Sequence, residues 1–395
     1  MNSVTENDTL DKAKTTRGAL KDLALLFLKL GTIAFGGPAA HIAMMDDEVV
    51  RRLRWLSREE FLDLLGASNL IPGPNSTEMA IHIGHRRAGW PGLIVAGACF
   101  ILPAACIVFL LAWAYVQFGK LPELEGILYG VKPVVIAVVL QALWNLGRTA
   151  MKSSFLAGLG IIVAAANFFG VNELLLLFLA GVAACVAQFG VKAFASGSIP
   201  ALLPGAIVSA LKTTGAAAFG LWPMFLFFLK VGSVLFGSGY VLLAFLRADL
   251  VDRWHWLTES QLLDAVAVGQ VTPGPVFTTA TFIGYVLGGA KGGVFATIGI
   301  FLPAFVFVAI SGPLVPVMRG SPVVSAFLDG VVVASLGLMA VVTWYLLRAA
   351  LVDWVTLLLA ALSAVLLFRY KINSVWLVLS GAAIGLATVL LGPRQ

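Results

Sequence analysis

Long apolar stretches separated by short polar turns run along the chain from residue 22 almost to its end. A helix needs about 20 apolar residues to cross the hydrocarbon core of a membrane. In the first half, four such stretches cover residues 90–118, 126–147, 153–169 and 172–190. The pattern predicts an all-α polytopic membrane protein.

Two further apolar stretches are interrupted by the same motif, Pro72-Gly73-Pro74 and Pro273-Gly274-Pro275. A proline lacks the amide donor and clashes with the preceding turn, so a continuous helix must break at each motif. In residues 59–84 the break leaves arms of roughly 15 to 18 Å, too short to span a membrane alone. The arms form either one discontinuous helix or a re-entrant hairpin. Breaks at membrane depth are tolerated where protein or a water-filled cavity surrounds them.

The second half of the chain repeats the first. Lys29-x-Gly31-x-x-x-Phe35-Gly36 recurs as Lys230-x-Gly232-x-x-x-Phe236-Gly237, and Leu102-Pro103-Ala104 recurs as Leu302-Pro303-Ala304. We therefore expect two homologous repeats of about 5–6 hydrophobic segments each, with broken or re-entrant helices at the Pro-Gly-Pro motifs, as in transporters whose halves meet at a midplane site. The expected division is a cytoplasmic N-terminal tail (1–21), the first repeat (22–190), a linker or extra span (191–218) and the second repeat (219–391).

Composition excludes a water-soluble globule, because 60% of the residues are hydrophobic, 12% are charged and the mean hydropathy is +0.97. The net charge of +6 lies mostly in short loops and the N-terminal tail, which indicates membrane orientation rather than nucleic-acid binding. Neither a metal-ligand spacing nor a catalytic or nucleotide-binding motif is recognisable. We expect no enzyme activity, no cofactor and no metal.

Loop cations give only partial information on orientation. Those of the first half fall mainly at residues 51–58, 86–87 and 148–152, which the positive-inside rule assigns to the cytoplasm. The second half is weakly biased. Charge alone therefore leaves parallel and inverted arrangements of the two repeats open.

The helix breaks have the chemistry of an anion site. Helices that start after Pro74 and Pro275 point amides and the positive ends of their dipoles at the break. Glycine lets a ligand approach the backbone closely, and neighbouring polar side chains add donors for a tetrahedral oxyanion. The expected substrate-binding residues are Lys29, Gly36, Gly37, Gly73, Asn75, Ser76, Thr77, Lys230, Gly237, Gly274, Thr278 and Thr279.

The lysines in this set occupy equivalent positions within apolar helices. No acidic residue lies near Lys29 or Lys230 on the same helix. An unpaired ammonium at the centre of a membrane helix costs at least about 2.5 to 3.5 kcal/mol, so the transported anion is the expected partner. The simpler interpretation is that both side chains extend to the membrane surface.

Glu78 and His82 lie four residues apart, on one face of the helix after the first break. A carboxylate and an imidazole can exchange a proton near neutral pH, which makes them candidates for proton coupling. Their counterparts Thr279 and Phe282 do not titrate in this way. The alternative is a structural hydrogen-bonded pair. Lys132 and Asp329, near helix starts, are interpreted as interfacial.

The motif strings resemble the long, two-domain form of the chromate ion transporter family. The resemblance rests on Phe35-Gly36-Gly37-Pro38, on Asn69-Leu70-Ile71-Pro72-Gly73-Pro74-Asn75-Ser76-Thr77-Glu78-Met79-Ala80 and on Thr272-Pro273-Gly274-Pro275, and it covers nearly all of the chain after residue 22. It implies a multi-pass protein of the bacterial inner membrane that exports chromate and confers chromate resistance. It also implies that the two halves are homologous and oppositely oriented.

Other functions remain open at this point. Sulfate has the same shape and charge as chromate, so it is the expected competitor, and physics alone does not rank the two. An anion channel is the second class, because re-entrant breaks also build selectivity filters. The expected partners are the oxyanion and the lipid bilayer, without nucleic acid, and a homodimer is one oligomeric state that the sequence allows.

Overall fold

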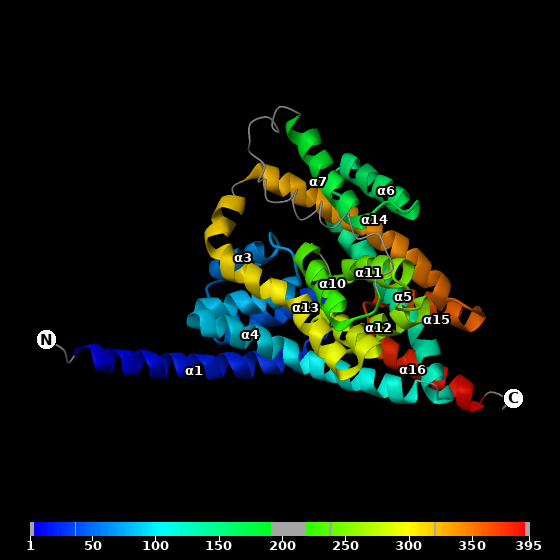
Figure 1. Cartoon of the computed structure of the whole chain (residues 1–395), viewed down its shortest axis with the longest axis horizontal. Coiled ribbons are helices and arrows are strands. Elements are labelled where there is room, and N and C mark those ends of the chain that lie inside the picture. Colours follow the sequence, from blue (N-terminus) through cyan, green and yellow to red (C-terminus); the bar gives the residue numbers. More distant parts are fainter. Residues whose placement is uncertain are drawn as a thin grey trace.

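The computed structural model describes residues 4–35, 37–119, 121–190, 218–236, 239–319 and 321–391, and every regular element within these residues is a helix (Figure 1). The first repeat contains α1 (Val4–Ile33), α2 (Gly37–Asp46), the π-helix η1 (Asp47–Arg52), α3 (Arg58–Ser68), α4 (Asn75–Phe118), α5 (Pro122–Ala150), α6 (Ser154–Phe168) and α7 (Glu173–Phe189).

The second repeat has the same order of elements. It contains α10 (Leu221–Val234), the 3-10 helix η2 (Gly239–Val241), α11 (Leu242–Leu246), the π-helix η3 (Arg247–Arg253), α12 (Glu259–Val271), the 3-10 helix η4 (Val276–Thr278), α13 (Thr279–Arg319), α14 (Pro322–Ala350), α15 (Trp354–Tyr370) and α16 (Ser374–Leu391). The all-α fold and its internal repeat are thus confirmed. Residues 191–217 of the expected linker lie outside the described residues.

Each of the longest helices, α4 and α13, contains a sharp reversal. Gly89 in α4 and Gly289 in α13 have φ values of 61° and 60°, which break the helix. A Cβ atom added to Gly84 would lie 2.2 Å from the carbonyl oxygen of Gly92, although residues eight apart in a straight helix are about 12 Å apart. In α13, the hydroxyls of Thr281 and Thr297 are 2.7 Å apart. Each long helix is therefore a hairpin of a short and a long arm.

The short arm of α4 also runs back along α3. Glu60, in the first turn of α3, forms a 2.8 Å ion pair with Arg86, near the end of the short arm. If the two arms continued in one direction, these residues would lie far apart. The first Pro-Gly-Pro motif is therefore the tip of a re-entrant hairpin, which decides between the two arrangements that the sequence leaves open.

The equivalent helices α5 and α14 are antiparallel. Tyr129, near the start of α5, donates a 2.6 Å hydrogen bond to Asp353, just beyond the end of α14. Lys152, just beyond the end of α5, forms a 2.7 Å ion pair with Asp329, near the start of α14. Tyr129 and Asp329 are equivalent residues of the two repeats, so the two contacts correspond to each other. The repeats are therefore inverted, as the family resemblance implies.

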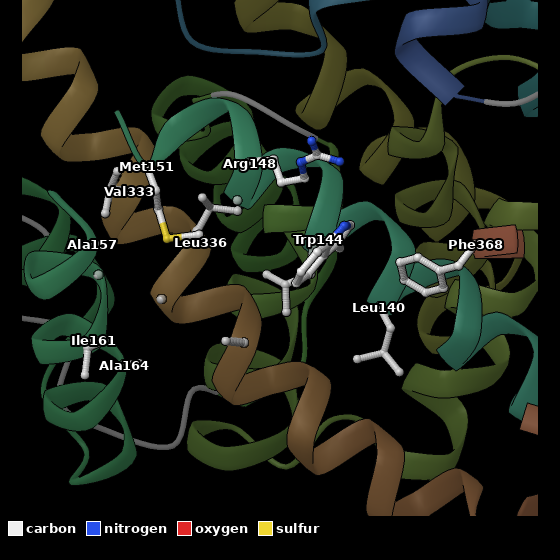
Figure 2. Close-up of a pocket in the computed structure, with 15 residues that line it drawn as sticks. Leu140, Trp144, Arg148, Met151, Ala157, Ile161, Ala164, Val333, Leu336 and Phe368 are labelled. Carbon is white, nitrogen blue, oxygen red and sulfur yellow. The ribbon is translucent and has the colours of Figure 1, made fainter. Parts of the chain in front are cut away.

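Within the part of the chain that the structure describes, four helices are long and apolar enough to cross a membrane, namely Asn75–Phe118, Pro122–Ala150, Val276–Ser311 and Pro322–Ala350. They pack closely at glycines. Gly31 of α1 abuts the carbonyl of Phe100, and Gly232 of α10 abuts that of Ile300 in the equivalent contact. Beside α14, an apolar cavity opens between α5, α6 and α15 (Figure 2). The chain is a multi-pass membrane protein.

Candidate anion site at the paired re-entrant tips

The first tip forms because the local sequence ends one helix and starts another. A capping box between Ser57 and Glu60 starts α3, which ends at Ser68. Pro72 and Pro74 exclude helix from the following turn. Helix α4 then begins at Asn75 with no side chain capping it. The amides of Thr77 and Glu78 donate to the carbonyl of Pro74, so the amides of Asn75 and Ser76 are the ones that lack intrahelical partners.

The second tip is built in the same way, but it uses its hydroxyls differently. Thr258 and Gln261 form the capping box of α12, and the 3-10 helix η4 follows Pro275. Thr278 donates its hydroxyl to the carbonyl of Pro275 at 2.9 Å, and Thr279 donates to that of Val276 at 2.8 Å. Both hydroxyls are buried, and each donates its proton to its own backbone.

Each tip is bonded to the opposite repeat by one of a reciprocal pair of hydrogen bonds. The amide of Gly73 donates to the carbonyl of Leu235 at 2.7 Å, and the amide of Gly274 donates to the carbonyl of Ala34 at 2.9 Å. Ala34 and Leu235 are equivalent residues at the ends of α1 and α10. Each Pro-Gly-Pro tip is thus bonded to the first helix break of the other repeat. This contact places the two predicted anion sites side by side.

The space above the tip glycines is occupied by protein, which corrects the expectation of an open approach to both. A Cβ on Gly73, where φ is 139°, would lie 2.2 Å from Oε1 of Glu78. A Cβ on Gly274, where φ is 84°, would lie 2.7 Å from the Cβ of Ala104. Glycine is required at both positions by the backbone conformation and by close packing.

Polar side chains after the first tip are buried without partners. Thr77 and Glu78 have 0% exposed surface, and Oγ1 of Thr77 and both carboxyl oxygens of Glu78 have no hydrogen-bond partner among the described residues. His82 is 8% exposed, and its Nε2 also lacks a partner there. The interpretation of Glu78 and His82 as a hydrogen-bonded pair is therefore wrong. Buried polar groups are normally bonded, so this cluster suits a ligand, water or a proton.

His41 of α2 joins the two tips, and the sequence patterns did not predict it. Its Nδ1 lies 3.2 Å from the hydroxyl of Ser76, and its Nε2 lies 3.0 Å from the carbonyl of Ala34, which also accepts the Gly274 amide. The ring is 1% exposed and packs edge-on against Phe100. Its counterpart in the second repeat is Leu242. A lone histidine in an apolar stretch carries no periodic signal.

The remaining predicted residues lie at the margin of this cluster. Asn75 donates to the side chain of Asn69 at 2.7 Å in an exposed contact. Gly37 begins α2 with φ of 77°, and a Cβ added to it would meet no atom within 4 Å. Gly36 and Gly237 lie outside the described residues.

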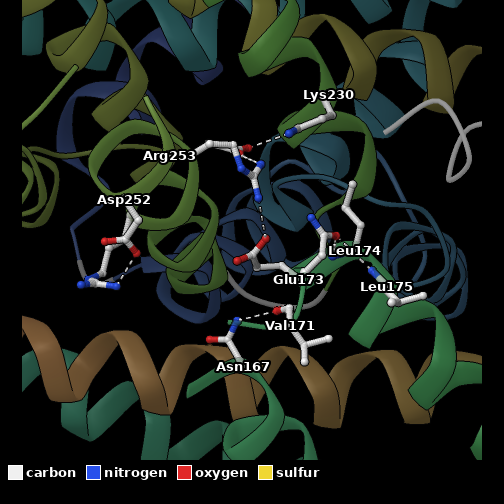
Figure 3. Close-up of polar contacts among 11 residues, drawn as sticks. Asn167, Val171, Glu173, Leu174, Leu175, Lys230, Asp252 and Arg253 are labelled. Atoms are coloured by element: carbon white, nitrogen blue, oxygen red, sulfur yellow. Dashed lines mark hydrogen bonds and ion pairs between the residues drawn. The ribbon is translucent and has the colours of Figure 1, made fainter. Parts of the chain in front are cut away.

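The premise that Lys29 and Lys230 lack acidic partners is wrong. Lys29 forms a 2.6 Å ion pair with Glu48, and Lys230 forms a 2.6 Å ion pair with Asp249. The two acids are equivalent residues of the π-helices, 19 positions after the lysines, and packing brings them back onto α1 and α10. Arg52 and Arg253 complete the pairs as repeated triads, and Figure 3 shows Arg253 directed also toward Glu173 of α7.

The first triad fixes the ionisation of its acid, Glu48. Burial would raise the pKa of Glu48, but the hydrogen bonds from Lys29 and Arg52 outweigh it and hold that pKa below its ordinary value. The carboxylate is therefore ionised at neutral pH. The triad of Lys29 holds two cations and one anion, and keeps one net positive charge, whereas Arg253 of the second triad also faces the carboxyl group of Glu173.

Replacing Lys230 by methionine is expected to lower the free energy of unfolding by about 1 to 3 kcal/mol, because Asp249, whose side chain is 3% exposed, loses one of its charged partners. Lys29→Met should cost less than about 1 kcal/mol, because the Lys29 side chain is 50% exposed. Thermal unfolding in detergent measures both. Unchanged stability with weakened chromate affinity in both variants would instead assign the lysines to the substrate.

Lys132 is partly buried, with 18% of its side chain exposed, and it makes contacts between the two repeats. It forms a 2.9 Å ion pair with Asp264 of α12 and a 2.8 Å hydrogen bond to Ser260. Tyr115 donates a 2.9 Å hydrogen bond to the same carboxylate. These residues line a cavity of about 400 Å³ between the repeats. Asp329, in contrast, pairs with Lys152 at an exposed position, in agreement with the sequence.

Comparison with known proteins gives the family. A model of the chromate transporter family matches residues 21–186 and 222–386, one match for each repeat. The chain is 34% identical over 387 residues to a chromate transport protein of Pseudomonas aeruginosa, covering 93% of this chain and 92% of that protein. It is 32% identical over 376 residues to a chromate transport protein of Cupriavidus metallidurans, covering 92% of each. No solved structure is significantly similar to it. With both inverted repeats matched over nearly their full length, the chain belongs to the chromate transporter family.

Proposed function

We propose that this chain is a secondary transporter that carries chromate out of the cytoplasm across the bacterial inner membrane, and so confers chromate resistance. The observation that carries the proposal is the reciprocal bonding of each re-entrant tip to the first helix break of the other repeat, by Gly73 to Leu235 and by Gly274 to Ala34. Paired breaks of inverted repeats are the usual place of a transported substrate. The relatives named as chromate transport proteins support the substrate, and transport rather than an enzymatic reaction is the activity.

The oxyanion binds at the start of α4 in this proposal. The amides of Asn75 and Ser76 and the positive end of the helix dipole favour a negative ligand there. The buried hydroxyl of Thr77 has no other partner among the described residues. Thr278 and Thr279 contribute less, because their protons are donated to backbone carbonyls. The binding site is therefore asymmetric, although the fold is repeated.

Lys29 and Lys230 act in this proposal as members of their triads, and the triad of Lys29 supplies a net positive charge. An ammonium that is already paired with a carboxylate does not need the substrate to compensate it. This residual charge makes the potential near the first helix break of the first repeat more positive, which attracts dianions toward the tips. The lysines therefore assist binding from a distance, while the tips hold the ligand.

Glu78 and His82 supply proton coupling. The carboxyl of Glu78 lies against Gly73 at the tip, and an ionised carboxylate there would repel a neighbouring dianion. Chromate binding and protonation of this group therefore favour each other, with His82 one helical turn away as the proton donor. A dianion that leaves with one proton moves net negative charge outward, in the direction that an inside-negative membrane potential drives.

Chromate flux in proteoliposomes that contain the full chain tests this function. We expect flux that saturates with chromate, responds to imposed pH and voltage gradients, and is inhibited by sulfate. Flux that rises linearly and ignores the pH gradient would indicate an anion channel instead. If excess sulfate leaves chromate flux unchanged, a site that recognises only the shape and charge of a tetrahedral dianion is excluded.

A further inference from the structure

The apolar cavity beside α14 has a single charged residue at its boundary. It measures about 590 Å³, within the range of about 300 to 1,000 Å³ that is typical of ligand sites, and it lies between α5, α6, α14 and α15. Leu140, Trp144, Ile161, Leu336 and Phe368 are among its apolar walls, and Arg148 is the one ionisable residue that lines it. Figure 2 shows Arg148 at one end and Leu140 toward the other.

The dimensions of the cavity match one leaflet of a bilayer. Its α5 wall runs from Leu140 to Met151, which is about 16 Å of helix. Half of the hydrocarbon core of a membrane is about 15 Å thick. Arg148 lies in the last turn of α5, so the charged end is at the membrane surface and the apolar end near the midplane. An acyl chain that enters from the surface would follow this path.

The charge at the mouth selects the head group. Arg148 is exposed and forms no ion pair with the residues that the structure describes, whereas Lys152 nearby pairs with Asp329. An unpaired guanidinium is a donor fork suited to phosphate oxygens. Trp144, 58% exposed one turn earlier, has the amphipathic character of an interfacial anchor. Basic pockets between membrane helices on the cytoplasmic side hold anionic lipid head groups.

We propose that this cavity binds an anionic phospholipid, with its phosphate on Arg148 and one acyl chain between α5, α6 and α14. This cavity has no lining residue in common with the polar cavity at Lys132, and none of its lining residues belongs to the two tips. The cavity is lined by α5 of the first repeat and by α14 of the second. A lipid bound in it therefore bridges the two halves of the transporter.

The test measures binding of phosphatidylglycerol and of phosphatidylcholine with the same acyl chains to the purified full chain, by native mass spectrometry. We expect phosphatidylglycerol to bind more tightly, and Arg148→Gln to weaken it by about fivefold, the effect of one cation near an anionic lipid. Arg148→Lys should retain binding. Ala164→Phe, which fills the wall of the cavity, should weaken both lipids.

Arg348 is the matched control, because it is the repeat counterpart of Arg148, lies in the last turn of the antiparallel α14 and does not line the cavity. Arg348→Gln should leave binding unchanged. Equal losses in Arg148→Gln and Arg348→Gln would show general surface attraction and overturn the proposal. Glycerol phosphate binding as tightly as the lipid would show a phosphate site without an acyl chain, and unchanged binding in Ala164→Phe would exclude the cavity. Unfolding temperatures of all variants report on folding.

Discussion

Replacing Glu78 by glutamine is expected to remove the response of chromate flux to a pH gradient while the protein still folds. The carboxyl group is fully buried against the first tip and has no hydrogen-bond partner among the described residues. Glutamine has nearly the same shape as a protonated glutamate, but it cannot exchange a proton. Coupling between two binding sites typically amounts to a factor of about 5 to 150, so the ratio of flux with and without the gradient should fall by about tenfold.

The measurement is chromate flux in proteoliposomes at matched voltage, with and without an imposed pH gradient. Glu123→Gln is the control, because Glu123 is an exposed carboxylate in the first turn of α5. It should behave like the unaltered protein. A Glu78→Gln variant whose flux still responds fully to the pH gradient would remove Glu78 from the coupling mechanism and leave it a structural residue.

Gly274→Ala is expected to destabilise the protein by about 2 to 5 kcal/mol and to abolish transport with it. Its φ of 84° costs a non-glycine residue about 1 to 2 kcal/mol. The new methyl group would also meet the Cβ of Ala104 at 2.7 Å, and overpacking of this kind costs about 1 to 3 kcal/mol. Both costs fall on the contact between the repeats. Thermal unfolding and chromate flux measure the effect.

A second substitution separates the two costs. Ala104→Gly combined with Gly274→Ala should recover the packing part of the loss but not the backbone part. Gly158→Ala is the control, because nothing lies within 4 Å of a Cβ at that helical position. If Gly274→Ala unfolds at the same temperature as the unaltered protein, the close approach of the two repeats at this tip is wrong.

The equivalent change in the first repeat should behave differently. A methyl group on Gly73 would meet the end of the flexible Glu78 side chain at 2.2 Å, and that side chain can move, whereas the Cβ of Ala104 is fixed to its backbone. Gly73→Ala should therefore lose less packing energy than Gly274→Ala, although it keeps the backbone cost of its φ of 139°, and it should disturb pH coupling as well. The comparison of the two glycines indicates that the repeats share a fold but differ in function. The first tip contacts a titratable carboxyl group, and the second contacts a packed methyl group.

The helix breaks and the repeat could be predicted from the sequence because their causes are local. A proline lacks an amide hydrogen in any surroundings, so Pro72 and Pro273 exclude helix wherever the chain places them. The inverted arrangement could not be predicted in this way, because it depends on contacts such as Tyr129 with Asp353 between distant segments. The loop charges that might have indicated it nearly balance in the second half.

The partners of the lysines could not be found from neighbouring residues for a different reason. Proximity in sequence is a poor measure of proximity in space, and Glu48 and Asp249 lie 19 residues from the lysines that they bind. A usable signal is present, because both acids occupy equivalent positions in the two repeats, as Arg52 and Arg253 do. His41 offers no such signal, since its counterpart is a leucine.

The antiparallel α5 and α14 constrain how such a chain can originate. A single half, made as a separate polypeptide, would have to insert in both orientations to pair with an inverted copy of itself. Insertion is directed by the excess of lysine and arginine beside the spans, so that ancestral half would need cations balanced between its two faces. Fusion lifts the requirement, because the first half then fixes the direction of the second. The first half is free to concentrate arginines at residues 51–54 and 86–87, while the second can keep a balanced set of loop charges.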